Sequence, residues 1–115
     1  MLGLELTEEQ AIDLVSKKLP DKEFCLVRSW EWIDLIMPEA AIAEIQQLGR
    51  KPVVMFAHTV ILDSKGRFRA GDWVRSTLLV SFSSGCIFET SNTAYVLIGA
   101  GKRKSVDAST VLSIF

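Results

Sequence analysis

The chain has 115 residues, of which 49% are hydrophobic and 23% charged, and its formal net charge at pH 7 is −1. This length is enough for one domain with its own hydrophobic core, and the composition excludes a disordered chain. No stretch approaches the roughly 20 apolar residues of a membrane span, and the beginning of the chain lacks the pattern of a secretory signal peptide. We therefore expect a single cytoplasmic domain, residues 1–115, with no membrane association.

Acidic and basic side chains are unevenly distributed along the chain. Residues 1–50 carry ten acidic and five basic side chains, whereas residues 64–104 carry seven basic and two acidic ones. The sequence therefore divides into a helix-rich acidic part, 1–50, and a β-rich basic part, 51–115. Two interpretations stay open: the two parts complement each other within the fold, or the basic part attracts an anionic partner.

Residues 8–18 are predicted to form an amphipathic helix. Thr7 and Gln10 have the spacing of a capping box, and acidic residues occupy the first turn, where the helix dipole favours them. Apolar residues follow at helical spacing: Ala11, Ile12, Val15 and Leu19. The Pro20-Asp21 pair ends the helix.

The segment FCLVRSWEWI, residues 24–33, mixes aromatic and β-branched residues with polar ones, which is typical of a strand. Trp30 and Trp32 are two residues apart and therefore lie on one face of that strand. Two interpretations stay open for this pair. The indoles either pack a helix on the sheet or form an exposed binding platform.

A second helix is predicted after Met37, with Pro38 in its first turn and Gly49 at its C-terminal end. Its apolar face would consist of Ile42, Ile45 and Leu48. The following segment VVMFAHTVIL, residues 53–62, is nearly continuously apolar and predicts a strand covered on both sides. A turn and a basic loop, residues 63–72, then lead to the last part of the chain.

Residues 71–104 predict a β-meander, around which the rest of the chain is organised. From Trp73 onward the sequence alternates, which places four apolar side chains on one face of the first strand: Val74, Leu78, Val80 and Phe82. Ser83-Ser84-Gly85 and Ser91-Asn92 have the composition of hairpin turns. We expect consecutive antiparallel strands over 72–99, with Tyr95 and Leu97 in the same core and the helix of residues 8–18 packed on it.

A small amphipathic sheet must curl or be covered, because otherwise its apolar face and its edges meet water. We therefore expect an α+β protein with N-terminal helices packed on an antiparallel β-meander that closes into an SH3-like barrel. After Lys104 a brief strand should pair back to the sheet. Asp107 is expected to cap a final turn over 108–115 that packs three apolar side chains on the sheet: Val111, Leu112 and Ile114.

No catalytic constellation is evident in the sequence. His58, the single histidine, alternates with Phe56 and Val60 and is expected to be a structural residue of an apolar strand. Cys25 and Cys86 are expected to be reduced, partly buried thiols, and neither has the sequence signature of a nucleophile. Glu89 is expected to pair across the sheet with a base such as Arg75. No residues have metal-ligand spacing. We predict a non-enzymatic protein without metal or cofactor.

The loop of residues 99–105, GAGKRKS, is rich in glycine and basic residues. A phosphate-binding P-loop is excluded, because that motif requires glycine where this chain has Val96, and no helix is predicted to follow. The loop is then either a turn with solvated lysines or a contact for nucleic-acid phosphate or an acidic protein surface.

Aromatic and basic side chains are candidates for a binding surface. Trp73 and Arg75 share the outward face of the first meander strand, and the basic loops should emerge near the ends of the same sheet. We expect a patch that contacts an acidic protein partner, with Arg75 and Arg103 as anchors and Trp73 as the buried contact. The candidate binding residues are Trp30, Trp32, Arg67, Arg69, Trp73, Arg75, Lys102, Arg103 and Lys104.

Residues 71–106 resemble the C-terminal half of a family of small uncharacterised proteins, a domain of unknown function, from pseudomonads, their phages and mobile elements. A GDWVR-type strand, an FET-N-T-Y-V-L strand pair and a G-x-G-x-R-K turn recur in that family and are present here. The resemblance implies no activity. It implies a mobile-element context, in which small proteins often inhibit bacterial defence systems, including CRISPR complexes, by binding.

We therefore predict a non-enzymatic protein-binding module, with an inhibitor of a bacterial defence system as its implied role. The alternative is an SH3-like module associated with nucleic acid, in which the basic loops contact phosphates and Trp73 or Trp30 stacks on bases. The near-neutral net charge favours a protein partner, because nucleic-acid-binding domains are more often basic overall. The sequence does not decide the oligomeric state.

Overall fold

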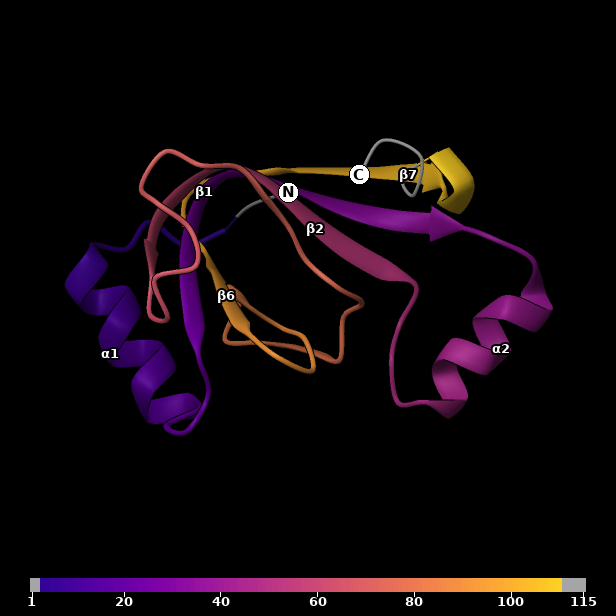
Figure 1. The fold of residues 1–115 in the computed structure, drawn as a ribbon, viewed down its shortest axis with the longest axis horizontal. Helices are drawn as coiled ribbons and strands as arrows, with labels where there is room; N and C mark the ends of the chain where they lie inside the picture. Colours follow the sequence, from indigo (N-terminus) through magenta and orange to yellow (C-terminus); the bar gives the residue numbers. More distant parts are fainter. Residues whose placement is uncertain (1–2, 111–115) are drawn as a thin grey trace.

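The computed structural model describes residues 3–110 of the chain. Two helices lie at opposite ends of an arched sheet (Figure 1). In chain order the elements are α1 (Glu8–Lys18), β1 (Phe24–Ile36), α2 (Glu39–Gln47), β2 (Val53–Asp63), β3 (Val74–Arg75), β4 (Ser81–Ser83), β5 (Ile87–Glu89), β6 (Ala94–Leu97) and β7 (Lys102–Asp107).

Helix α1 begins with the predicted capping box. The Gln10 amide donates to Thr7 Oγ1 at 3.1 Å, and the Thr7 amide donates to Gln10 Oε1 at 2.9 Å. Ala11 and Val15 on its inner face are fully buried. The prediction of a helix over 8–18 is therefore confirmed.

Helix α2 begins after Pro38 and is followed by Gly49, whose φ of 74° is the left-handed conformation that a helix end commonly requires. None of the residues of α2 is buried, and Leu48 beyond its end is 69% exposed. The predicted apolar face of this helix therefore does not enter the core.

The seven strands form one open sheet in the order β3-β2-β1-β6-β5-β4, with β7 also paired to β1. β1 is antiparallel to β2 but parallel to β6 and β7. The expected α+β class is confirmed. The expected SH3-like barrel is not confirmed, because the sheet is not closed: β3 and β4 stand at opposite ends of the strand order.

The predicted meander is present only in part. β4, β5 and β6 are consecutive and antiparallel, and the two hairpin turns lie where the sequence indicates. The first meander strand, however, is divided, because β3 pairs with β2 on the far side of β1. Between β3 and β4, Ser76 binds the Met55 backbone through both its amide and its Oγ, each at 2.8 Å. This side-chain contact interrupts the regular alternation that the sequence suggested.

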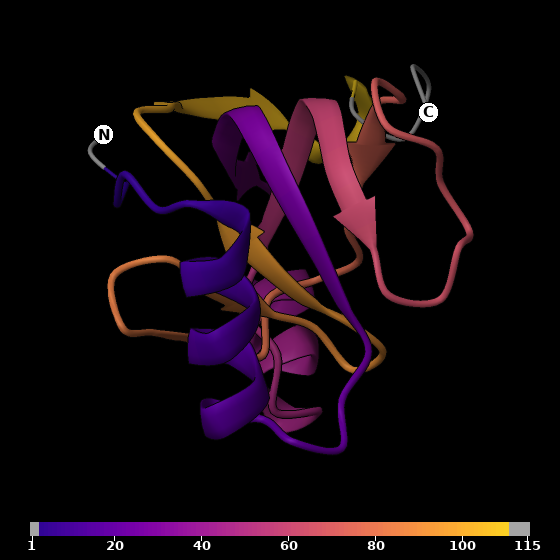
Figure 2. The same cartoon turned by 90° about the vertical axis from the view of Figure 1, so that its left-hand side faces the viewer.

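β6 and β7 follow the same edge of β1 one after the other. β6 pairs with residues 24–27 and β7 with residues 31–36. Between them the Trp30 ring lies so close to Gly101 that a Cβ at that position would be 2.3 Å from it. Ser29 has a φ of 53°, and the β1–β2 register shifts at Leu26/Val27. The sheet bends at this level, as Figure 1 shows, while β1 and β2 stay side by side (Figure 2).

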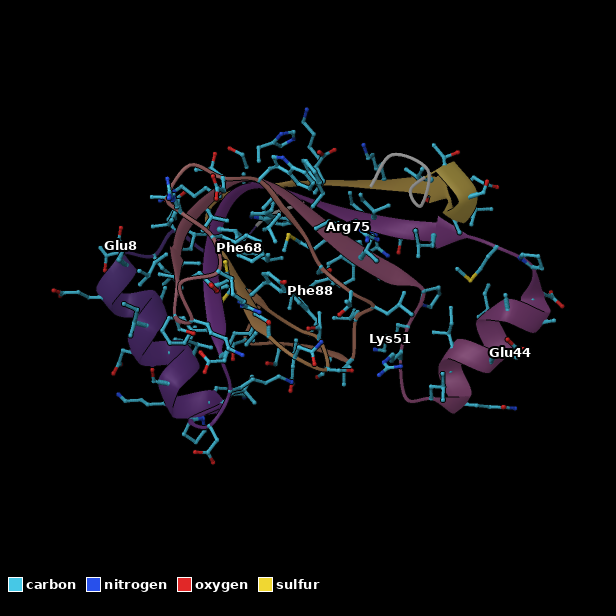
Figure 3. The ribbon with its side chains drawn as sticks, viewed as in Figure 1. Glu8, Glu44, Lys51, Phe68, Arg75 and Phe88 are labelled. Carbon is cyan, nitrogen blue, oxygen red and sulfur yellow. The ribbon has the colours of Figure 1, made fainter. Side chains whose placement is uncertain are left out.

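Trp30 and Trp32 belong to the core inside this bend and are 1% and 7% exposed. The Trp30 Nε1 donates to the Gly99 carbonyl at 3.1 Å. Trp32 makes edge-to-face contacts with Phe82 at 5.1 Å and with Phe88 at 5.4 Å. Phe88 lies within the arch (Figure 3). The structural interpretation of the tryptophans is confirmed, but strands rather than a helix cover them, and the indoles do not form an exposed platform.

A second core lies under α1. Ala11 and Val15 of the helix pack against Leu26, Ile87 and Val96. Val74, Tyr95 and Leu97 belong to the first core instead, and Phe82 is only partly buried against it. The expectation of a single core packed by α1 is therefore wrong: side chains of β1 and β6 alternate between two cores because both faces of these strands are covered.

Near the end of the described residues, β7 confirms that the chain pairs back to the sheet after the glycine-rich turn. The Asp107 carboxylate accepts a hydrogen bond from the Ser109 amide at 2.9 Å, as expected for a cap. The three apolar side chains predicted to pack after this cap lie outside the described residues: Val111, Leu112 and Ile114.

Candidate functional site

One rung of paired residues crosses four strands of the sheet. Arg75 of β3 pairs with Phe56 of β2, Phe56 with Glu31 of β1, and Glu31 with Lys102 of β7. Directly paired residues project from the same side of a sheet. We call this side, opposite the core of Trp30 and Trp32, the outer face.

An aromatic group occupies the outer face next to this rung. The Trp73 ring stacks on the Phe56 ring at 5.7 Å with an interplanar angle of 22°. His58, two residues further along β2, meets the Phe56 ring edge to face at 4.7 Å. Trp73 is 57% exposed, which is unusual for so large an apolar side chain. The stack supports its exposed indole from one side and leaves it accessible.

Glu31 organises the charges of the outer face. Its carboxylate lies 2.9 Å from His58 Nε2 and 3.0 Å from Lys104 Nζ. Burial alone would raise the pKa of Glu31, but hydrogen bonds with Lys104 and His58 outweigh it and hold the pKa below its ordinary value. Glu31 therefore stays ionised at neutral pH and fixes two side chains beside the aromatic stack.

His58 has a hydrogen-bond partner in Glu31, as expected for a structural histidine, but its side chain is 59% exposed. The strand was expected to be covered on both sides, but its outer side is open at this position. Glu89 does not pair with Arg75. Lys22 Nζ lies 2.7 Å from the Glu89 carboxylate and also donates to the Thr90 carbonyl, at the other end of the sheet.

The predicted binding residues do not all gather in one place. Trp73, Arg75, Lys102 and Lys104 share the outer face. Lys102 to Lys104 belong to strand β7 and not to a loop, so consecutive side chains alternate between the two sides of the sheet. Arg103 consequently projects to the opposite side.

Arg103 forms an ion pair with Asp34. Its Nε lies 2.8 Å from Asp34 Oδ2, a second guanidinium nitrogen lies 3.1 Å from Oδ1, and the group stands 5.4 Å from the Trp32 ring. This hydrogen bonding holds the pKa of Asp34 below its ordinary range against the effect of burial. Arg103 covers the edge of the core and does not project from the outer face beside Arg75. Its role as a binding anchor stays a prediction.

Arg67 is structural for a similar reason. Its guanidinium lies 2.8 and 3.1 Å from the two oxygens of the buried Asp63 carboxylate and 3.0 Å from Thr93 Oγ1. A buried carboxylate requires such a partner, because an unpaired charge would be costly in the interior. Arg69 lies in the loop before β3, where its amide donates to Asp72 Oδ2 at 2.9 Å.

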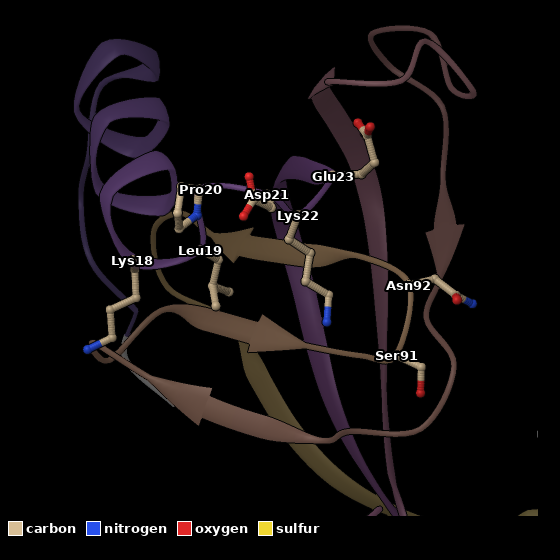
Figure 4. Close-up of a pocket in the computed structure, with 8 residues that line it drawn as sticks. All are labelled: Lys18, Leu19, Pro20, Asp21, Lys22, Glu23, Ser91 and Asn92. Atoms are coloured by element: carbon tan, nitrogen blue, oxygen red, sulfur yellow. The ribbon is translucent and has the colours of Figure 1, made fainter.

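One hollow adjoins the outer face, and another lies at the opposite end of the molecule. An apolar groove of about 310 Å³ continues the outer face toward α2 and is lined by Leu35, Met37, Ile45, Val54, Arg75, Thr77, Leu78 and Ala108. A larger, shallow hollow of about 520 Å³ lies at the end of α1 (Figure 4) and is lined by Lys18, Leu19, Pro20, Asp21, Lys22, Glu23, Ser91 and Asn92. Its central base, Lys22, is already bound to Glu89.

The two thiols have the chemistry of core residues. Cys25 and Cys86 are free and fully buried, more so than the sequence suggested. Burial, together with the nearby Asp63 carboxylate, raises the pKa of Cys25 to about 12, and burial raises the pKa of Cys86. Both thiols are therefore protonated at neutral pH, which makes them poor nucleophiles. No group of three or more potential metal ligands occurs among residues 3–110.

Sequence reasoning identified Trp73, Arg75, Lys102 and Lys104 but missed the three residues that connect them, Phe56, His58 and Glu31. The missing information was the pairing of β1 with β2 and β7, which joins residues 25 and 71 positions apart. The only local signal was the single histidine within the largely apolar strand β2.

The fold and this surface define a small α+β protein with an open mixed sheet and an aromatic and basic outer face. The chain belongs to a family described as Domain of unknown function (DUF6957), whose model matches residues 2–113. The expected membership of an uncharacterised family is thereby confirmed over nearly the whole chain. Neither a curated protein nor a solved structure matches the chain. No helix within residues 3–110 has the length and apolar character needed to cross a membrane.

Proposed function

We propose that this protein is a non-enzymatic protein-binding module whose outer face contacts an acidic surface of a partner protein. The observation that supports the proposal is the exposed Trp73 indole, stacked on Phe56, on a face that also carries the basic side chains of Arg75, Lys102 and Lys104. An exposed tryptophan near charged side chains is typical of residues that dominate binding energy. Lys102 and Lys104 supply charge that favours an acidic partner.

The inhibition of a bacterial defence system remains the biological setting that we propose for this binding. Its support is the resemblance to proteins of phages and mobile elements, and it requires no catalytic group. Expression of the chain in a bacterium with an active CRISPR system, followed by phage challenge, tests this setting. Restored phage growth supports it, and undiminished interference contradicts it.

Affinity capture tests the binding itself. The tagged chain is incubated with an extract of the cells that encode it, and bound proteins are identified by mass spectrometry. Trp73→Ala should weaken the capture of a specific partner by about 2 kcal/mol, as for a residue at the centre of an interface. Lys102→Glu should also weaken it, whereas the same charge reversal at Lys18, at the end of α1, should not.

All variants should retain the wild-type melting temperature, because the three side chains lie outside the two cores. Capture that is unchanged in both Trp73→Ala and Lys102→Glu would contradict the proposal. The nucleic-acid alternative predicts another result: nucleic acid in the eluate, a steep loss of binding with salt, and similar small effects from each exposed base.

A further inference from the structure

The outer edge of β7 is open. This six-residue strand pairs with β1 on one side, and within residues 3–110 no strand pairs with its other side. Five of its six residues are exposed, and Val106 is half-buried. An edge of this kind presents a row of backbone donors and acceptors that can pair with another extended chain.

The comparison with β6 shows where a further strand would lie. β6 occupies the same edge of β1, and its own outer edge is covered by β5. β5 pairs only with residues 94–96 of β6, so among the described residues no strand continues its line beside β7. An added strand there would extend the existing sheet without changing its pairing.

Side chains of β7 determine which strand this edge would accept. Lys102 and Lys104, two residues apart, project to the outer face, where Lys104 is held by Glu31. Lys102 has no ion-pair partner among residues 3–110. Side chains at alternate positions of an adjacent strand would lie directly beside these two ammonium groups.

Lysine on an edge also repels basic edges, so it both protects the strand and selects its partner. Arg103 contributes less to this selection, because Asp34 already binds its guanidinium. The Lys102 end of the edge therefore carries one excess positive charge on the outer face and a compensated pair on the other side, while the exposed Asp107 carboxylate lies at the far end of the strand.

We propose that a partner's extended acidic segment binds as an additional strand along the outer edge of β7, with carboxylates at alternate positions beside Lys102 and Lys104. This inference rests on the proposed function and specifies which kind of partner segment binds beside β7, at one edge of the outer face. Backbone hydrogen bonds supply affinity in such β-augmentation, and alternate side chains supply specificity. The remainder of the partner would then lie over the outer face toward Trp73.

The test uses three synthetic peptides and the full chain labelled with ¹⁵N. The peptide TVEVEVT has two glutamates at alternate positions, TVKVKVT replaces them with lysine, and TVEPEVT interrupts the strand with proline. Amide shifts and amide hydrogen exchange are followed during titration. We expect TVEVEVT to shift the amides of residues 102–107 and to slow the exchange of those that face outward at least tenfold.

TVKVKVT and TVEPEVT should each bind at least tenfold more weakly than TVEVEVT. In Lys102→Glu, TVEVEVT should lose at least tenfold in affinity, and TVKVKVT should gain. The matched variant Lys18→Glu, which makes the same charge change at the other end of the molecule, should bind all three peptides as the wild type does.

No response of the β7 amides at millimolar TVEVEVT, or equal binding of the three peptides, would overturn the inference. Shifts confined to Trp73 and Phe56, with unchanged exchange in β7, would overturn it while leaving the proposed function intact. Failure of the proposed function is recognised in a different experiment: the capture of partner proteins would be the same for the wild type, Trp73→Ala and Lys102→Glu.

Discussion

The two halves of β1 have the same backbone conformation but different surroundings. Residues 24–27 lie between β2 and β6, and their side chains are buried in both cores. Residues 31–36 lie between β2 and β7, and the outer face on this half carries the exposed aromatic and charged groups beside a small apolar cluster around Ile33 and Val54. One strand therefore both stabilises the fold and presents a surface, because its covered half fixes the position of its open half.

The largest expected difference in the free energy of unfolding is between two leucines, one in each half of β1. Leu26 is fully buried against α1, whereas Leu35 is only partly buried beside Ile33 and Val54. Leu26→Ala should lower the free energy of unfolding by roughly 2–5 kcal/mol, because it leaves a cavity in a closed core. Leu35→Ala should cost about 1 kcal/mol, because less apolar area is lost.

Urea denaturation of both variants measures these costs, and an unchanged m value would show that the unfolded state is the same. A cost for Leu35→Ala that equals the cost for Leu26→Ala would contradict the division of β1 into a covered and an open half.

Local patterns predicted the elements of the covered half well. The capping box and the turns at 83–85 and 91–92 are formed by residues close together in sequence. Ser84 and Gly85 have the positive φ values, 56° and 73°, that such a tight turn requires. These features depend on short-range hydrogen bonds and backbone preferences, which the sequence encodes directly.

The open half could not be predicted in the same way. Which residues meet there depends on the parallel pairing of β1 with β7 and on the pairing of β3 with β2 instead of β4. Both pairings join residues far apart in sequence. The alternation of residues 73–82 suggested one strand, but Ser76 binds the backbone of β2 and divides it. The exposure of His58 and the pairing of Arg103 with Asp34 depend on the register between the strands, which no local pattern reveals.

An intermediate loss of stability is expected when the ion pair between Asp63 and Arg67, beside the covered half of β1, is removed. Burial alone would raise the pKa of Asp63, but the hydrogen bonds and charge of Arg67 outweigh it, so the pKa lies below its ordinary value. Folding therefore favours the ionised form. This stabilisation is fully present above the unfolded pKa of about 3.9 and is lost as the pH falls through the lower folded pKa.

Asp63→Asn should reduce the stability at pH 7 by roughly 2 kcal/mol, since Arg67 loses a charged partner, and should flatten the loss of stability in acid. Thermal unfolding between pH 7 and pH 2 measures both effects. The matched control is Asp13→Asn, which removes an exposed pair with Lys17 and should cost less than about 0.5 kcal/mol. Equal acid profiles for wild type and Asp63→Asn would show that Asp63 does not carry this dependence.

The smallest effect is expected in the open half, at Glu31. Glu31→Gln keeps the size of the side chain but removes the charge that binds His58 and Lys104. Lys104 is 51% exposed, so water screens much of the attraction, and the loss at pH 7 should be no more than about 1 kcal/mol. The double variant with Lys104→Met should reveal a coupling energy of roughly 0.2–1 kcal/mol.

Because folding holds the pKa of Glu31 below its ordinary value, its contribution should be present above about pH 4.3, the unfolded pKa, and disappear as the pH falls through the folded pKa. Binding of a partner over the outer face would remove water from this group and strengthen the pair. The coupling energy measured in the complex should therefore exceed the value for the free protein. A coupling that is large in the free protein and unchanged in the complex would mean that Glu31 serves the fold and not the surface.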